Sequence, residues 1–394
     1  MSKKYAFFGP AHLSGVTTFY NVLAAGLAPR GIELKRIGVR DRKPVHDSGA
    51  GTLIDRAGLT DRQLAGALYR AVMDGGYDGV FFNILVEPHT ANLARYLPES
   101  MTKVLILHGI GNGMYTWARA IRDWLHHTIA IAPRMHEDLP ADWGFDAARV
   151  SLIPHGVGAP FAAEGRERPD DGVLRVLVAG RLADADKGCL WIPDILAPLG
   201  DVTLELTVAG DGADRAALER RLARIPHKVS FTGPVSQDVL AGLYRRSDVL
   251  LFPSRTEGFA LVLLEAMASG CVPVASQIRG VTDAAVTDGH DGLLFPIGQT
   301  ASATAALRRL AQDRPLLHRL SAAAAATAAT RFTLERQMDA YAALLDRLDA
   351  ARPPVAPALD MARWNMAAGL RPRLRSRLPQ PVKVWLRTAA EKWR

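Results

Sequence analysis

The chain alternates between short runs of apolar residues and longer stretches in which apolar positions recur every three or four residues. A short apolar run that ends at glycine, proline or polar residues is typical of a buried strand, and the longer period is typical of a helix packed on one face. The runs predict strands at residues 5–8, 34–39, 79–82, 103–107, 128–132, 174–179, 204–209, 249–252 and 272–275, with a further strand and turn at 229–235. Helical patterns lie between most of them, so we predict an α/β chain with parallel, doubly wound sheets.

Two stretches lack a clear period and are predicted to be connections. Residues 41–60 are polar and contain glycine, which predicts a surface excursion, and residues 158–172 are rich in glycine, proline and charge, which predicts a linker. With 394 residues the chain is long enough for two domains of ordinary size. We therefore predict an N-terminal domain at 1–160, a C-terminal domain at 170–350 and a tail at 351–394.

The rest of the chain is organised around residues 247–276. A short apolar run at 249–252 is broken by Pro253, a helical pattern follows from about 259 to 269, and Gly270 suits a left-handed helix cap. A second apolar run closes the unit. This order predicts one strand–helix–strand crossover of a parallel sheet.

Two carboxylates, with seven residues between them, mark this crossover as a candidate site. Glu257 precedes the predicted helix, and Glu265 lies about two turns into it between apolar neighbours. A charge inside an apolar helix needs a partner or a ligand, although the pair could also be a loop end and a solvated residue. Amides at the start of a helix lack helical partners and form a natural anion site. Here these amides belong to Gly258, Phe259, Ala260 and Leu261. Such a site could bind a phosphorylated polyhydroxyl compound.

Further candidate residues follow other predicted strands. His108 lies where open α/β sheets bind ligands, and a satisfied loop histidine is the alternative. Gly15 starts a helix after the first strand and could let a phosphate approach the backbone, although glycine-bearing loops are common. Arg181 and Lys187 follow the strand at 174–179. Two such cations can neutralise a pyrophosphate, and a solvated pair without function is the alternative.

Composition is that of a soluble globular protein, with 48% hydrophobic and 22% charged residues. The two cysteines, Cys189 and Cys271, are far apart and lack metal-ligand spacing, which predicts a reducing, cytoplasmic compartment. The first apolar run is too short for a signal peptide, and no stretch approaches the roughly 20 apolar residues that span a bilayer.

The positive charge is concentrated in the tail. Residues 351–394 contain ten Arg and Lys but only two acidic residues, and the resulting +8 equals the formal charge of the whole chain. One interpretation is a helix packed across both domains with a solvated basic face. The other is that residues 363–394 contact an anionic membrane surface, at the inner face of the membrane, where each basic residue contributes about 1 kcal/mol. No recognised nucleic-acid-binding motif accompanies the charge, so we expect no nucleic acid partner.

The crossover resembles the retaining glycosyltransferases of family 4 (glycosyl transferases group 1), which have the GT-B fold of two Rossmann-like domains facing across a cleft. Their signature is E-G-F-G-L-x-x-x-E-A-M-A-x-G-x-P-V, and this chain has Ala260 where the family often has glycine. Gly180-Arg181 and Lys187-Gly188 are similar to the family phrase G-R-x…K-G. The resemblance covers residues 1–350 and is strongest from 174 to 296.

The resemblance implies roles for these residues around a nucleoside diphosphate sugar. Glu265 would hold the ribose hydroxyls, Glu257 the hydroxyls of the transferred sugar, and Arg181 with Lys187 the diphosphate. The remaining donor contacts would come from Gly15, His108, Gly180, Gly233 and Val235, together with the amides at residues 258–261. The two cations can replace a divalent metal, so we expect no metal ion and no other cofactor.

The function implied is that of a retaining glycosyltransferase of the hexosyltransferase class, acting in polysaccharide biosynthesis. It would move a sugar from a nucleoside diphosphate sugar, UDP rather than GDP, to a glycan or a lipid-linked acceptor. One alternative keeps the fold and changes the reaction to that of a nucleotide-sugar 2-epimerase. Another is a non-catalytic, membrane-associated binding protein, against which the complete set of cations and glutamates argues.

Overall fold

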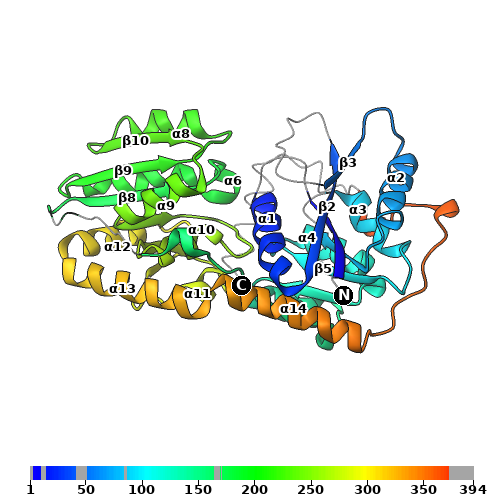
Figure 1. Cartoon of the computed structure of the whole chain (residues 1–394). Coiled ribbons are helices and arrows are strands. Elements are labelled where there is room, and N and C mark those ends of the chain that lie inside the picture. Colours follow the sequence, from blue (N-terminus) through cyan, green and yellow to red (C-terminus); the bar gives the residue numbers. More distant parts are fainter. Residues whose placement is uncertain are drawn as a thin grey trace. The chain divides into compact units, whose positions relative to one another are not determined.

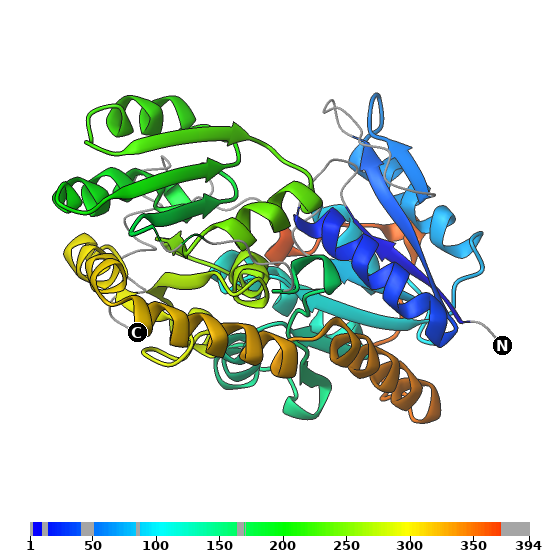
Figure 2. The same cartoon turned by 60° about the vertical axis from the view of Figure 1, so that its left-hand side comes forward.

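A computed structural model describes residues 3–9, 15–40, 51–83, 87–163, 169 and 171–371 (Figures 1 and 2). The chain forms two compact units. The first consists of Met1–Pro154 with Glu335–Arg373, and the second of His155–Leu334 with Leu374–Arg394. Each unit is built on one parallel sheet, as the alternation of strands and helices predicts.

The first unit contains a parallel sheet of seven strands in the order β3-β2-β1-β4-β5-β6-β7. Its strands are β1 (Lys3–Phe8), β2 (Ile32–Arg40), β3 (Gly51–Asp55), β4 (Gly79–Asn83), β5 (Thr102–Leu107), β6 (His127–Ala130) and β7 (Val150–Leu152). Tyr5 of β1 is in register with Leu34 on one side and with Gly79 on the other, so the strand order reverses at β1 and β4. Ligands of doubly wound sheets bind at the carboxyl ends of the strands at such a reversal.

The α-helices described in this unit are α1 (Gly15–Leu27), α2 (Asp61–Met73), α3 (Pro88–Asn92), α4 (Asn112–Ile121), α5 (Pro133–Trp143) and α14 (Leu334–Ala350). The start of α2 is fixed by a capping box, in which the Thr60 side chain and the Gln63 side chain each accept a hydrogen bond from the other's backbone amide. Strand β3 is a difference from the sequence analysis, which expected residues 41–60 to form no element. It is a short edge strand with largely exposed side chains, so no apolar run marks it in the sequence.

Helix α14 belongs to the first unit, whereas the predicted C-terminal domain extended to residue 350. The reason is the packing of its apolar face: Tyr341 is fully buried, and its ring lies 6.1 Å from that of Phe81. An ion pair of 2.8 Å between Lys3 Nζ and Asp346 Oδ1 also joins this helix to the first strand.

Residues 351–371 pack on the first unit as an irregular segment with two short 3₁₀ turns, Met361–Arg363 and Ala368–Leu370. Backbone hydrogen bonds from Ala356 to Asp123 (2.8 Å) and from Leu359 to Arg95 (2.7 Å) hold this segment in place. The predicted basic amphipathic tail therefore begins, in its described part, as a packed strap without an α-helix. Residues 372–394, most of the stretch expected to contact a membrane, lie outside the described residues.

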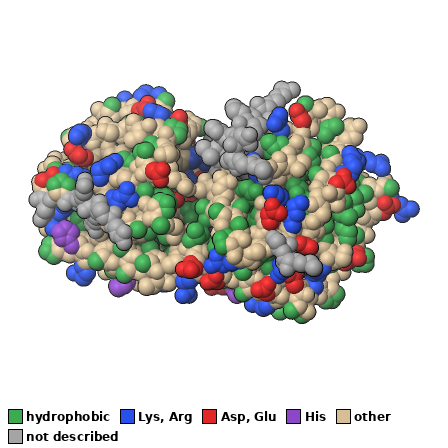
Figure 3. Space-filling view, viewed as in Figure 1, with side chains coloured by type: hydrophobic (Ala, Val, Ile, Leu, Met, Phe, Trp, Pro, Cys, Tyr) green, Lys and Arg blue, Asp and Glu red, His purple; other side chains and the backbone are tan. Residues whose placement is uncertain are grey.

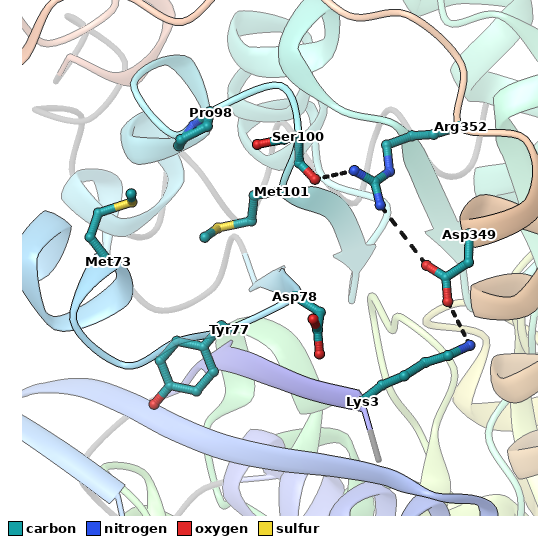
Figure 4. A pocket seen from close by; sticks show the side chains of 9 residues that line it. All are labelled: Lys3, Met73, Tyr77, Asp78, Pro98, Ser100, Met101, Asp349 and Arg352. Carbon is teal, nitrogen blue, oxygen red and sulfur yellow. Dashed lines mark hydrogen bonds and ion pairs between the residues drawn. The ribbon is translucent and has the colours of Figure 1, made fainter. Parts of the chain in front are cut away.

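A cavity of about 410 Å³ lies at the amino ends of the strands of the first sheet (Figure 4). Lys3 at the start of β1 and Asp78 just before β4 line it, together with Asp349 and Arg352. Figure 4 shows Lys3 and Arg352 both directed at Asp349, so the basic groups are already paired. The cavity therefore lies at the end of the sheet opposite to the carboxyl ends of the strands, where ligands of doubly wound sheets bind.

The second unit contains a parallel sheet of six strands in the order β10-β9-β8-β11-β12-β13. The strands are β8 (Leu174–Ala179), β9 (Leu204–Ala209), β10 (Lys228–Gly233), β11 (Val249–Phe252), β12 (Val272–Gln277) and β13 (Leu293–Pro296). Its described α-helices are α6 (Asp184–Lys187), α7 (Ile192–Leu196), α8 (Arg215–Leu222), α9 (Gln237–Arg246), α10 (Leu261–Ala268), α11 (Thr282–Ala285), α12 (Thr300–Gln312) and α13 (Arg314–Arg331). Consecutive residues of β8 point to opposite faces of the sheet and enter different cores, Val176 in one and Leu177 in the other. The sheet is therefore covered on both faces, which explains the unbroken apolar runs of its strands.

Among the described residues, each helix is too short or too polar to span a lipid bilayer. Basic and acidic side chains are interspersed on the face seen in Figure 3. The interspersion agrees with the balanced charge of residues 1–350.

Candidate active site

The candidate site lies at the carboxyl ends of β8 and β11, where the strand order of the second sheet reverses. Strand β8 pairs with β9 on one side and with β11 on the other. A pocket between the two strand ends is lined by Gly180, Arg181 and Lys187 from the first connection and by Phe252 and Ser254 from the second. Sequence reasoning singled out three of these five residues, and the topology explains why they meet.

Glycines bring the strand ends of this sheet close together. Gly180 has a φ of 123°, a backbone conformation that favours glycine. A Cβ on Gly210 would lie 1.9 Å from the carbonyl oxygen of Gly180, so the turns after β8 and β9 touch through their backbones. The amide of Gly210 donates to the carbonyl of Gly233, at the end of β10, over 2.9 Å. Val235 packs half-buried in one of the two cores.

Helix α6 presents Lys187 to the loop after β11. The helix ends at Gly188, whose φ is 58°, and a Cβ there would lie 2.2 Å from the carbonyl oxygen of Pro253. Lys187 Nζ donates to Glu257 Oε1 over 2.6 Å, with 28% of the lysine side chain and 8% of the glutamate side chain exposed. The two predicted residues, which are seventy positions apart in the sequence, therefore form a partly buried ion pair.

Arg181 lies on the solvent side of the same pocket. Its side chain is 62% exposed, and its Nη2 atom lies 3.0 Å from Asp186 Oδ2. Asp186 belongs to α6. Both predicted cations are therefore paired with carboxylates near the carboxyl ends of β8 and β11, Arg181 with Asp186 and Lys187 with Glu257. Sequence reasoning did not identify Asp186, although its place next to Lys187 in an acidic helix start was a usable signal.

Glu265 lies in α10 between Leu264 and Ala266, both of which are fully buried. Burial raises the pKa of Glu265 to about 7, and the hydrogen bond from the Tyr244 hydroxyl acts in the opposite direction. That bond joins Tyr244 to Glu265 Oε2 over 3.1 Å. The partner that a charge in an apolar helix requires is thus a tyrosine of α9, which nothing in the sequence indicated.

The start of α10 is two residues later than predicted, at Leu261. Ala260 precedes the helix and accepts a hydrogen bond of 3.0 Å from the Leu263 amide. Phe259 is buried, and its ring packs 6.3 Å from that of His155, whose pKa burial lowers to about 4. Gly258 lies in the half-buried loop that connects Glu257 to this anchor.

Ser254 is a further residue of the pocket that sequence reasoning missed. Its side chain is 1% exposed, and its hydroxyl makes no hydrogen bond to the described residues. An orphaned buried hydroxyl is costly unless a ligand or water satisfies it. Within the described residues, no group of three or more His, Cys, Asp or Glu side chains is placed to hold a metal ion.

Gly15 and His108, the two other predicted site residues, belong to the first unit. Gly15 is the first residue of α1. His108 follows β5, and its ring packs edge-on against Phe19 with ring centres 5.0 Å apart. The structure therefore brings Gly180, Arg181, Lys187 and Glu257 together at the carboxyl ends of β8 and β11. The roles of Gly15 and His108 toward the donor stay predictions.

Comparisons with known proteins identify the family. A family model described as "Glycosyl transferases group 1" matches residues 174–313, the part that holds these groups. The chain is 30% identical over 306 residues to the alpha-D-kanosaminyltransferase of Streptomyces kanamyceticus, over 72% of this chain and 78% of that one. It is 33% identical over 223 residues to the D-inositol 3-phosphate glycosyltransferase of Streptomyces bingchenggensis, over 50% of this chain and 48% of that one. The matched part is thus about half the length of the latter relative.

Solved structures share the fold at low sequence identity. The sucrose-phosphate synthase of Thermosynechococcus elongatus has a TM-score of 0.72 and 19% identity, over 89% of this chain and 100% of that one. HepE of Anabaena, solved in complex with UDP and glucose, has a TM-score of 0.71 and 15% identity, over 88% of this chain and 100% of that one. Two Rossmann-like units, the cations and glutamates at the reversal of the second sheet, and these matches lead to one assignment. The chain belongs to the glycosyl transferases group 1 family, family 4 of the glycosyltransferases with the GT-B fold.

Proposed function

We propose that the protein is a retaining glycosyltransferase that moves a sugar from a nucleoside diphosphate sugar to a glycan or a lipid-linked acceptor. The observation that carries the proposal is the meeting of Arg181, Lys187 and Glu257 at the reversal of the second sheet. A uridine donor is preferred over a guanosine donor, and the structure of HepE with UDP and glucose is in line with that choice.

The two cations supply most of the chemistry in this proposal. Arg181 and Lys187 bind the diphosphate and stabilise the negative charge that grows on it as the bond to the sugar breaks. Both are paired with carboxylates in the free protein. Diphosphate oxygens would replace Asp186 on the exposed Arg181, whereas Lys187, whose ammonium has three N–H donors, would bind the diphosphate and keep its bond to Glu257. Fixed cations of this kind do the work that a divalent metal does in other transferases, and we propose a metal-independent enzyme.

The glutamates orient the two ends of the donor. Carboxyl oxygens accept hydrogen bonds from vicinal hydroxyls, and a protonated carboxyl can also donate one, which suits Glu257 to the transferred sugar and Glu265 to the ribose. Glu265 lies half-buried in an apolar helix, where a hydroxyl pair compensates for the water that the carboxylate has lost.

The proposed reaction needs no nucleophile from the protein. The acceptor hydroxyl attacks the anomeric carbon from the face that the diphosphate leaves, so the configuration is retained. The bond from the anomeric carbon to the phosphate oxygen breaks, the bond to the acceptor oxygen forms, and a leaving phosphate oxygen takes the acceptor proton. His108, on the first unit, is proposed to face the donor sugar.

The test is a matrix of UDP-, GDP- and ADP-sugars, with nucleoside diphosphate release and the anomeric configuration of the product measured by NMR. Arg181→Ala should lower transfer by a factor of about 100 or more while leaving the melting temperature unchanged, because this exposed side chain contributes little to folding. Near-normal turnover in the folded variant would overturn the assignment. Conversion of the donor sugar without acceptor would indicate the epimerase alternative instead.

A further inference from the structure

We propose that Arg255 and Asp184 form a clamp that positions Lys187 and Glu257 against each other. The clamp rests on the proposed function only for its effect on turnover. Arg255 lies two residues before Glu257, and its charge alone would suggest a third cation for the diphosphate. Its contacts point instead to a positioning residue that does not touch the donor.

The side chain of Arg255 is held from two directions within the unit, by Asp184 and by Trp191. Its Nε atom donates to the carbonyl of Asp184 over 2.8 Å, and Nη2 donates to Asp184 Oδ2 over 2.9 Å. The guanidinium lies 3.5 Å from the ring centre of Trp191, and only 12% of the side chain is exposed. A guanidinium that is stacked and held by two hydrogen bonds has a fixed orientation, which a lysine ammonium would not reproduce.

The backbone beside Arg255 repeats the connection. The amides of Arg255 and Thr256 both donate to the carbonyl of Asp186, over 2.8 Å and 3.3 Å. The same two segments, α6 with its cap and the loop after β11, also approach closely where Gly188 lies against the carbonyl of Pro253. The loop that carries Glu257 is therefore hydrogen-bonded along the short helix that carries Lys187.

Asp184 is itself held on its other side. Its Oδ1 atom accepts a hydrogen bond of 2.9 Å from the Leu190 amide, and its own amide donates to Asp214 Oδ2 over 2.7 Å. One carboxylate thus ties the turn after α6 to the loop after β11. Because Lys187 and Glu257 lie on the two tied segments, the 2.6 Å between their charged atoms depends on this carboxylate.

The test compares Arg255→Lys, Arg255→Ala and Asp184→Asn with the double variant Arg255→Ala/Asp184→Asn. We expect each single variant to lower kcat about tenfold, with the acceptor KM unchanged. The double variant should be no slower than the slower single variant, because both changes release the same contact. Arg308→Ala is the matched control, since Arg308 also pairs with one carboxylate, that of Asp201, and one carbonyl, that of Pro198, elsewhere in the unit. It should retain wild-type turnover.

Hydrogen–deuterium exchange tests the clamp without any transferase assay. The clamp predicts faster exchange in both 184–190 and 253–260 in the Arg255→Ala and Asp184→Asn variants, with the rest of the unit unchanged. Turnover within twofold of wild type in folded Arg255→Ala, or unchanged exchange in both segments, would overturn the proposal. If the wild type transfers no sugar but the exchange pattern appears, the proposed function fails and the clamp stands.

Discussion

At the scale of single residues, Asp186 competes with the donor for Arg181. The pair is exposed, so it contributes at most about 1 kcal/mol, and a diphosphate can displace it cheaply. Asp186→Asn should therefore tighten the binding of UDP by about two- to fivefold, as measured by titration calorimetry. The backbone carbonyl of Asp186, which receives the loop amides, is unchanged by this substitution. Weaker binding would show that the carboxylate orients Arg181 for the diphosphate instead of competing with it.

Glu265 gives the site a pH dependence whose sign follows from its environment. Burial raises the pKa of Glu265 from 4.5 to about 7, so the folded state holds a proton that the unfolded state releases. The stability that this proton contributes is present at low pH and is lost as pH rises from about 4.5 to 7. Buried His126, His127 and His155, whose pKa values are lowered to about 4, act in the opposite direction below about pH 6.5. The contribution of the glutamate is therefore read from the difference in stability between wild type and Glu265→Gln at each pH, because the histidines contribute equally to both proteins.

We expect Glu265→Gln to gain stability over wild type as the pH rises from 5 to 8, measured as the difference in melting temperature at each pH. In a Tyr244→Phe background, the melting-temperature difference that Glu265→Gln makes should have its midpoint at higher pH. The reason is that the tyrosine hydrogen bond lowers the pKa of the Glu265 carboxyl, and the phenylalanine removes that bond. A constant difference between wild type and Glu265→Gln across this range would contradict the raised pKa.

At the scale of elements, the junction of α6 with the loop after β11 depends on a glycine. Gly188→Ala adds a Cβ 2.2 Å from a backbone oxygen and places it at a φ of 58°. Gly172→Ala is the matched control, since its φ of 76° imposes the same backbone cost in open space. The control should lose about 1 kcal/mol of unfolding free energy. Gly188→Ala should lose at least twice that amount and most of its transfer activity, as followed by urea unfolding and donor turnover. Equal losses in both variants would show that the junction tolerates separation.

The sequence predicted the elements of the second unit well because its central strands are buried on both faces. Strands β8, β9 and β11 have the bounds that their apolar runs indicate. Strand β3 was missed because an exposed edge strand has no such run. The partners of two site residues, Tyr244 for Glu265 and Asp186 for Arg181, were also missed, as was Arg255 in the loop before Glu257. Their contacts depend on how the loops pack, and the signature of the family carries no information on that packing.

At the scale of the whole molecule, the basic tail is divided at Arg371, where the described residues end. Residues 351–371 are a strap on the first unit: Leu370 is 1% exposed, and the indole of Trp124 donates to the carbonyl of Pro357 over 3.0 Å. Residues 372–394 contain seven basic residues and one acidic residue. Any test of membrane binding must remove the second part and keep the first, because loss of the strap would expose apolar surface of the folded unit.

A chain that ends at Arg371 should keep the melting temperature and the soluble transfer activity of the full chain. It should lose binding to vesicles of phosphatidylcholine with phosphatidylglycerol, because near an anionic surface each basic residue contributes about 1 kcal/mol and six net charges are removed. Sedimentation of both chains with these vesicles, at low and high salt, measures this loss, and vesicles of phosphatidylcholine alone provide the baseline. A chain that ends at Arg352 should melt at a lower temperature, since the buried contacts of the strap are gone. If the chain ending at Arg371 binds the anionic vesicles as well as the full chain does, the tail has no membrane role. A lipid-linked acceptor would then lose the support that the charge of the tail provides.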